Sequence, residues 1–202
     1  MFRVFSKHSS KNKDLDWIPH PNIITPNLVL GGVNLVQDMS LVQQIKELYG
    51  VTHVLCCCDE VDESRRTINL SLMFNDDENG SSGSGVSFMK CVIEYFLVGS
   101  SSGQWEKFLA CFQFLDRATN GDARSLPLFL CDEREVTMGS GVAYVHCMRG
   151  RSRSATVVIS YLMYRYHLSL AEAYEYVKRR RPFIGPHQWL KRQLVALQPN
   201  II

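Results

Sequence analysis

Apolar residues in the first two thirds of the chain predict alternating strands and helices. Residues 28–32 predict a short edge strand that ends in a Gly-Gly turn. Residues 51–58 are an uninterrupted apolar run, which predicts a buried parallel strand, and residues 89–98 predict a further strand. Helical spacing occurs in residues 40–50 and again up to residue 121. The first of these helices is expected to begin at a cap at Ser40, to end at Gly50 and to carry Leu41, Ile45 and Leu48 on its apolar face. The apolar face of the second is expected to be Trp105, Phe108, Leu109, Phe112 and Leu115.

The last third of the chain continues the alternation. Residues 142–145 predict a strand, and residues 155–163 predict an apolar helix. Ser169-Leu-Ala-Glu172 is a capping box that opens a helix expected to run to Arg181, before Pro182. A final helix is expected to carry Trp189, Leu190, Leu194 and Leu197. Together these patterns predict an α/β fold with a central, mostly parallel sheet flanked by helices.

Composition fits one globular domain, because 46% of the 202 residues are hydrophobic. Residues 1–22 contain few core-type side chains and form a basic N-terminal extension, so the domain is expected to span residues 23–198. Two turn-rich segments, residues 75–87 and 122–141, are expected to be long loops. The first 13 residues hold no continuous apolar segment and no run could span a bilayer, so we expect neither a signal peptide nor membrane insertion.

Charge is unevenly distributed along the chain. Residues 141–202 contain 10 Lys and Arg against 2 Asp and Glu, although the whole chain carries only +2. A field of this sign attracts anionic substrates. The run Lys178 to Arg181 is expected to be a solvated helix end, because cations there complement the helix dipole.

The seven cysteines lack the spacing of a secreted disulfide framework or of a zinc site. Three of them are adjacent, at residues 56–58. We therefore expect a reducing, intracellular setting, which is cytoplasmic or nuclear.

Residues 146–154, His-Cys-Met-Arg-Gly-Arg-Ser-Arg-Ser, lie between the predicted strand and helix of the last third. A loop that enters a helix directs backbone N–H groups and the helix dipole at one point, which favours a bound anion. The same environment, with neighbouring cations, lowers a thiol pKa and makes Cys147 a thiolate. Arg153 offers two parallel donors to phosphate oxygens, and Gly150 lets the chain wrap closely around them. The loop residues that can donate side-chain hydrogen bonds within it are Ser152 and Ser154.

This loop resembles the signature of cysteine-dependent protein phosphatases, His-Cys, five residues, Arg, then Ser or Thr. Its Gly-x-Ser-Arg-Ser pattern and the helix after it resemble the dual-specificity branch, over roughly residues 23–198. The resemblance implies that Cys147 attacks phosphorus to form a phosphocysteine, that Arg153 binds the equatorial oxygens and that Ser154 assists release of the thiolate. It also implies that His146 tunes the thiolate and fixes the loop geometry. The expected phosphate-binding residues are Met148, Arg149, Gly150, Arg151, Ser152 and Arg153.

The sequence departs from the family in two places. His187 stands where Asn is usual, and a structural role is expected for it. The family takes its general acid, an Asp, from a loop upstream of the signature, but residues 98–104 contain neither Asp nor Glu. No general acid is assigned, because none of the substitutes has the expected spacing: Glu106, Asp76, Asp77, Asp132 and Glu133.

Three functions remain open. The favoured one is a protein phosphatase acting on phosphotyrosine, with phosphoserine and phosphothreonine as further substrates. The second acts on phosphoinositides or polyphosphates, because Arg149 and Arg151 add charge to the loop; Ser152 argues against it, since lipid phosphatases usually have Gly there. The third is a phosphate-binding pseudophosphatase scaffold without the acid, which the intact Cys147 and Arg153 argue against.

The expected partner is a phosphoprotein substrate, without nucleic acid, and no metal or organic cofactor is implied. In some relatives a second cysteine can bond the nucleophile and protect it from overoxidation. The resemblance makes Cys58 the first candidate for this role and Cys57 the second. Alternatively, the three adjacent cysteines are small buried hydrophobes.

Overall fold

The computed structural model describes residues 20–36, 39–58, 87–90, 101–119 and 141–201. The predicted loops lie outside these residues, except for Ser87 and Gly141 at their ends. The N-terminal extension does so as well, apart from its last three residues.

The centre of the molecule is a sheet, and five strands form it in the described residues: β1 (Asn22–Thr25), β2 (Leu28–Gly32), β3 (Val51–Cys56), β4 (Ser87–Lys90) and β5 (Val142–Cys147). Their order is β1-β2-β5-β3-β4. All neighbours are parallel except β1, which pairs antiparallel with β2 at one edge. This confirms the predicted mostly parallel sheet. It also places the end of β5 between two other strands.

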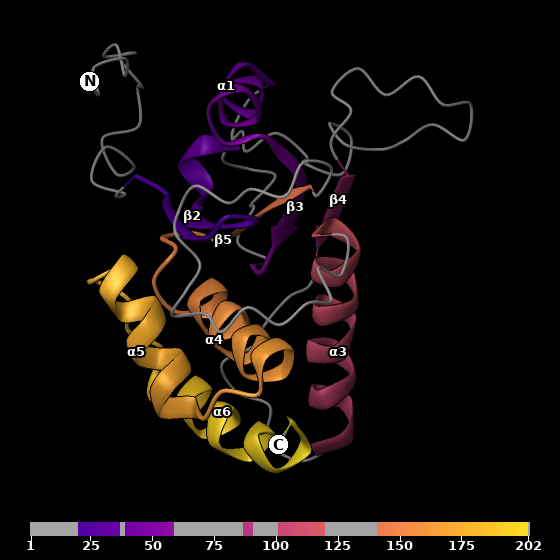
Figure 1. The fold of residues 1–202 in the computed structure, drawn as a ribbon, viewed down its shortest axis with the longest axis vertical. Helices are drawn as coiled ribbons and strands as arrows, with labels where there is room; N and C mark the ends of the chain where they lie inside the picture. Colours follow the sequence, from indigo (N-terminus) through magenta and orange to yellow (C-terminus); the bar gives the residue numbers. More distant parts are fainter. Residues whose placement is uncertain (1–19, 37–38, 59–86, 91–100, 120–140, 202) are drawn as a thin grey trace, which may run out of the picture.

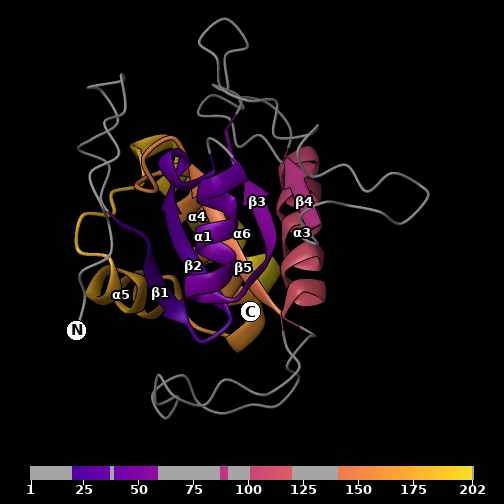
Figure 2. The ribbon, with the colours of Figure 1, turned by 90° about the horizontal axis from the view of Figure 1, so that it is seen from above.

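Helices cover both faces of the sheet: η1 (Val33–Leu35), α1 (Met39–Tyr49), α3 (Ser101–Ala118), α4 (Arg153–Tyr166), α5 (Leu170–Arg180) and α6 (Gln188–Ile201). Figure 1 shows α1 on one side of the sheet and α3, α4, α5 and α6 on the other, and Figure 2 gives the same layers from above. The buried residues accordingly form two clusters, a small one under α1 and a larger one around α4. Among the described helices, none combines the length and the hydropathy that a bilayer crossing requires.

Three local predictions were wrong. β2 is an inner strand, because residues 22–25 form the edge strand beside it, and Gly31 and Gly32 continue the strand instead of forming a turn. Helix α1 begins at Met39, before the expected cap, so its buried face is Val42 and Ile45 while Leu48 is 58% exposed. Helix α3 begins at Ser101, inside the segment expected to be a loop.

Glycine at position 31 is explained by close packing. A Cβ there would lie 2.2 Å from the hydroxyl of Tyr144 on β5. That hydroxyl donates a hydrogen bond to the carbonyl of Gly32 at 2.6 Å. The Tyr144 side chain therefore occupies the space that a side chain at position 31 would need.

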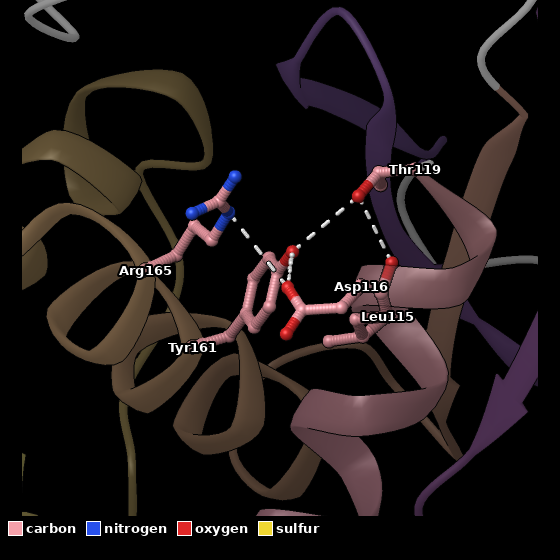
Figure 3. Close-up of polar contacts among 5 residues, drawn as sticks. All are labelled: Leu115, Asp116, Thr119, Tyr161 and Arg165. Carbon is pink, nitrogen blue, oxygen red and sulfur yellow. Dashed lines mark hydrogen bonds and ion pairs between the residues drawn. The ribbon is translucent and has the colours of Figure 1, made fainter. Parts of the chain in front are cut away.

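Polar contacts join α3 to α4, the helix that follows the signature loop (Figure 3). The hydroxyl of Tyr161 donates to Asp116 Oδ1 at 3.0 Å, and Arg165 Nε lies 3.7 Å from the same oxygen. The Thr119 hydroxyl donates to the Leu115 carbonyl and lies 3.5 Å from the Tyr161 hydroxyl. Burial raises the pKa of Tyr161, which therefore stays protonated as the donor. These contacts fix α4 against its neighbour.

Candidate active site

The signature loop connects the end of β5 to the first turn of α4. Cys147 is the last residue of the strand and is 3% exposed, and Arg153 is the first residue of the helix and is 7% exposed. Around them, Met148 is half-buried, while Arg149 and Arg151 are exposed. The sequence prediction of a strand, a loop and a helix is confirmed here.

The carbonyl groups of the loop are all hydrogen-bonded to residues that surround it. Val33 N donates to Met148 O at 3.2 Å, and Gly185 N donates to Arg151 O at 2.9 Å. The Arg181 guanidinium donates to Arg149 O through Nη2 at 3.4 Å and to Gly150 O through Nε at 2.7 Å. Ser152 O accepts from Thr156 N at 2.9 Å. Five consecutive carbonyls thus have donors. Because these bonds hold the carbonyls toward the surrounding protein, the loop's N–H groups are left for an anion at its centre.

Arg181 supplies two of these bonds and was missed by the sequence prediction, which placed it in a solvated run. It is 0% exposed, and its Nη1 donates to His20 O at 2.8 Å and to Asn22 Oδ1 at 2.6 Å. Burial lowers the pKa of Arg181 to about 10, so the guanidinium is charged at neutral pH. In the sequence, only the position of Arg181 directly before Pro182, where the helix ends, distinguishes it from the other cations of the run. Its hydrogen-bond partners lie far away in sequence, so the pattern could not identify them.

Gly150 is the loop position where only glycine fits. Its φ is +61°, a backbone conformation that side chains rarely allow. A Cβ would lie 2.3 Å from the Gly31 carbonyl oxygen and 2.6 Å from Arg181 Nη2. The glycine therefore permits β2, the loop and Arg181 to pack together, as the prediction of a close wrap required.

The thiol of Cys147 has a lowered pKa, as the sequence predicts. Burial alone would raise the pKa of this thiol, and it is the largest single contribution. Hydrogen bonds outweigh it: Ser154 Oγ donates to Cys147 Sγ at 3.2 Å, and backbone N–H groups of Ser154, Arg149 and Arg151 also donate to it. The backbone donors at the start of the helix agree with the prediction, and the Ser154 hydroxyl is an additional donor to the sulfur.

His146 lies away from the nucleophile. It is 0% exposed, and its ring stacks on Tyr144 with 5.7 Å between centroids. Residues 144 and 146 share one face of β5 while Cys147 takes the other, as strand alternation requires. His187 and Ser152, two further residues named in the sequence analysis, are in contact: the backbone N–H of His187 donates to Ser152 Oγ at 3.0 Å. The contact uses the backbone of His187, so a structural role for its side chain stays a prediction.

No carboxylate is placed at the loop by the residues that the structure describes. Glu106 is exposed on α3. The C-terminal end of α3, which holds Asp116, lies near the N-terminal ends of β3 and β5, whereas the loop follows the C-terminal end of β5. A Cβ on Gly141, just before β5, would touch the Ala118 carbonyl, and Phe114 packs on His53 near the start of β3. The other acidic candidates lie outside the described residues: Asp76, Asp77, Asp132 and Glu133.

The three adjacent cysteines are all 0% exposed at the end of β3, and each is a free thiol, as is Cys147. Cys58 is close enough to Cys147 for the charge of the nucleophile to raise the pKa of Cys58, although its bond with Cys56 and burial raise it more. A regulatory disulfide between Cys58 and Cys147 stays a prediction.

Comparison with known proteins agrees with this geometry. Residues 134–200 match the model of the dual specificity phosphatase catalytic domain. Dual specificity protein phosphatase 14 of Mus musculus is 50% identical over 66 residues, which are 33% of this chain and 33% of the mouse protein. The predicted resemblance to the dual-specificity phosphatase family is thus confirmed over residues 134–200. The chain matches this curated relative over only a third of that protein's length.

Solved structures show that the likeness in fold extends over most of the chain. PTPMT1 superimposes with a TM-score of 0.63 at 20% identity, covering 90% of this chain and 96% of that one. The human tyrosine phosphatase-like serine/threonine/tyrosine-interacting protein gives 0.62 at 20% identity, covering 89% and 96%. At these identities the likeness concerns the fold.

Proposed function

We propose that this family member hydrolyses phosphotyrosine, and also phosphoserine and phosphothreonine, in proteins through a phosphocysteine intermediate. The observation that carries the proposal is the cradle itself. Four consecutive loop carbonyls have donors from outside the loop and its helix, the fifth accepts the first hydrogen bond of α4, and a hydroxyl 3.2 Å from the sulfur stabilises the Cys147 thiolate. Such a site holds a tetrahedral dianion directly above a nucleophile.

In the first step, the Cys147 thiolate attacks phosphorus and the bond to the substrate oxygen breaks. The phosphoryl group is then on sulfur, and the alcohol or phenol leaves as its anion or takes a proton. Arg153 is nearly buried at the start of α4, and its guanidinium is suited to bind two equatorial oxygens. Together with the N–H groups, it stabilises the charge that spreads over these oxygens.

In the second step, water attacks the phosphocysteine and inorganic phosphate leaves. The Cys147 sulfur recovers its electron pair as a thiolate. Ser154 already donates a hydrogen bond to that sulfur, so it stabilises the leaving group of this step. The same bond therefore serves attack and release.

Substrate preference follows from the lack of a carboxylate at the loop among the described residues. General acid catalysis contributes about 10²- to 10⁴-fold, mainly for leaving groups that need a proton. Aryl phosphates, including phosphotyrosine, need that proton least. We therefore propose phosphotyrosine as the better protein substrate.

A phosphoinositide is the second candidate substrate, because Arg149 and Arg151 are exposed beside the cradle. They could contact additional phosphates on a lipid headgroup. The related fold of PTPMT1 has a solved complex with PI(5)P. We rank this candidate lower because position 152 is Ser, as in protein phosphatases.

A reducing, cytoplasmic or nuclear setting belongs to the same proposal, because the chemistry needs a reduced Cys147. The third function, a phosphate-binding scaffold, would have no use for a thiolate with a lowered pKa.

The experiment measures phosphate release from four substrates: an aryl phosphate, a phosphotyrosyl peptide, a phosphothreonyl peptide and a phosphoinositide. The wild type is compared with Cys147→Ser, which removes the nucleophile, and with Cys111→Ser, which removes another buried thiol. We expect turnover on the aryl phosphate and the phosphotyrosyl peptide that is lost only in Cys147→Ser. A preference for the lipid would overturn the protein-phosphatase assignment. Absence of Cys147-dependent turnover on all four substrates would favour the phosphate-binding scaffold over both enzyme functions.

A further inference from the structure

A second group of reactive side chains lies on the sheet beside the catalytic loop. Cys56 and His146 are paired in register on the parallel strands β3 and β5, so their side chains share a face. Cys58, two residues after Cys56 in the chain, returns to that face. Each of the three residues offers one ligand atom, and these atoms all lie within 4.8 Å of one another. All three residues are 0% exposed.

His146 lacks the partners that a buried imidazole normally has. Neither Nδ1 nor Nε2 makes a hydrogen bond of ordinary geometry, although both are shielded from water; the nearby thiol of Cys56 interacts with the ring, which lowers the pKa of that thiol. Buried polar atoms in folded proteins nearly always have a partner, so an orphaned pair calls for an explanation. A metal ion on one of the nitrogens would supply it.

The separation of the two sulfurs fits a particular ion. Cys56 Sγ and Cys58 Sγ lie 3.8 Å apart. Two sulfurs bound to one tetrahedral zinc ion at about 2.3 Å are about 3.8 Å apart, whereas a disulfide would bring them to about 2.05 Å. The pair is thus spaced for a shared metal without movement of the chain.

We propose that Cys56, Cys58 and His146 form a zinc site with two sulfur ligands and one nitrogen ligand. Thiolate and imidazole ligands suit Zn²⁺, and three protein ligands leave its fourth position open. The site would join the ends of β3 and β5 at the base of the catalytic loop, next to Cys147. Zinc would also occupy Cys58, so that metal binding and a Cys58 disulfide to the nucleophile exclude each other. The site does not depend on the proposed substrate.

The spacing of these residues in the sequence hides the site. Cys56 and Cys58 form a Cys-x-Cys pair, and His146 lies 90 residues after Cys56. Only the parallel pairing of β3 with β5 brings the third ligand to the other two.

The experiment titrates the full chain, reduced and freed of metal, with Zn²⁺ in competition with a chromogenic chelator. Cys56→Ser and Cys58→Ser remove one ligand each. Cys57→Ser is the matched control, because it changes the thiol between them on the other face of the extended chain. Cys147→Ser tests whether the catalytic thiolate is the real ligand.

We expect one zinc ion per chain in the wild type, Cys57→Ser and Cys147→Ser. In Cys56→Ser and Cys58→Ser the affinity should fall by more than about 100-fold, since loss of a residue that only hydrogen-bonds a metal ligand already costs about 10- to 100-fold. Zinc should raise the melting temperature of the wild type but not of these two variants. Circular dichroism of the metal-free proteins checks that each variant folds.

Co²⁺ provides a second readout that does not require tight binding. Thiolate-to-cobalt charge-transfer absorption should appear in the wild type, weaken in Cys56→Ser and Cys58→Ser, and persist in Cys57→Ser and Cys147→Ser. Loss of zinc and of these bands in Cys147→Ser alone would overturn the proposal, as would an absence of stoichiometric zinc in the wild type.

Discussion

Arg181 Nε donates a hydrogen bond to the carbonyl oxygen of Gly150 at 2.7 Å, across 31 positions of sequence. This bond links the segment after α5 to the middle of the catalytic loop. The same guanidinium reaches the start of β1 through Asn22 Oδ1 and the residue two positions earlier through His20 O. One buried side chain thus holds the loop against two distant segments.

Replacing Arg181 should therefore damage both stability and catalysis. Arg181→Ala would leave the buried carbonyl of Gly150 without its donor, and hydrogen bonds to a charged group contribute about 1.5–3 kcal/mol each. We expect the free energy of unfolding to fall by about 3 kcal/mol or more in denaturant titrations, with a parallel loss of phosphate affinity. Arg179→Ala, an exposed cation of the same run, is the control and should change little. Equal unfolding free energies and phosphate affinities in the two variants would mean that Arg181 is solvated like the rest of the run.

Gly150→Ala should disable the loop. A residue with a side chain at φ +61° costs about 1–2 kcal/mol, and its Cβ would also collide with the carbonyl of Gly31. The loop or β2 must shift, and a displacement of about 1 Å at a catalytic centre costs about 100-fold in rate. Turnover of an aryl phosphate measures this. Gly185→Ala is matched to it, because a Cβ there meets Arg151 only at an ordinary 3.5 Å; similar losses in both variants would contradict the argument.

Ser154→Ala should raise the pKa of Cys147. The Ser154 hydroxyl is the largest of the causes that lower this pKa, and its removal leaves burial less opposed. A hydrogen bond to a charged group is worth about 1.5–3 kcal/mol, so the thiolate loses that stabilisation. The pH dependence of Cys147 alkylation should therefore shift to higher pH.

The control for this shift is Ser160→Ala, another buried serine of α4, whose hydroxyl donates to the Val157 carbonyl. Its alkylation profile should coincide with that of the wild type. An unchanged profile in Ser154→Ala would mean that the backbone N–H groups alone set the pKa.

The sequence predicted what depends on neighbouring residues and missed what depends on distant ones. The strand, loop and helix around Cys147 follow from contiguous patterns, and so does the capping box at Ser169. The burial of Arg181 could not be predicted, because its partners are set by the packing of β1 and the loop. A run of four cations looks the same in sequence whether its last member is solvated or buried.

The sheet illustrates the same limit. The parallel partners of β3 and β5 put Cys56 beside His146, a relationship that no spacing in the chain expresses. β2 was expected at an edge because the short segment Asn22–Thr25 carries only two apolar side chains, too weak a pattern for a strand by itself. The hydrogen bonds of β2 make that segment a strand.

The contacts between α3 and α4 should support stability and not proton transfer. Asp116 accepts a hydrogen bond from Tyr161, but it lies near the N-terminal ends of the strands, whereas the signature loop lies at their C-terminal ends. Tyr161→Phe should lower the free energy of unfolding by about 1 kcal/mol, the usual value of one intramolecular hydrogen bond. Asp116→Asn should have a similar small effect, because the ion pair with Arg165 is partly solvated. Turnover of a phosphotyrosyl peptide should stay close to wild type in both variants; a drop in Asp116→Asn of about 100-fold or more would identify a general acid instead.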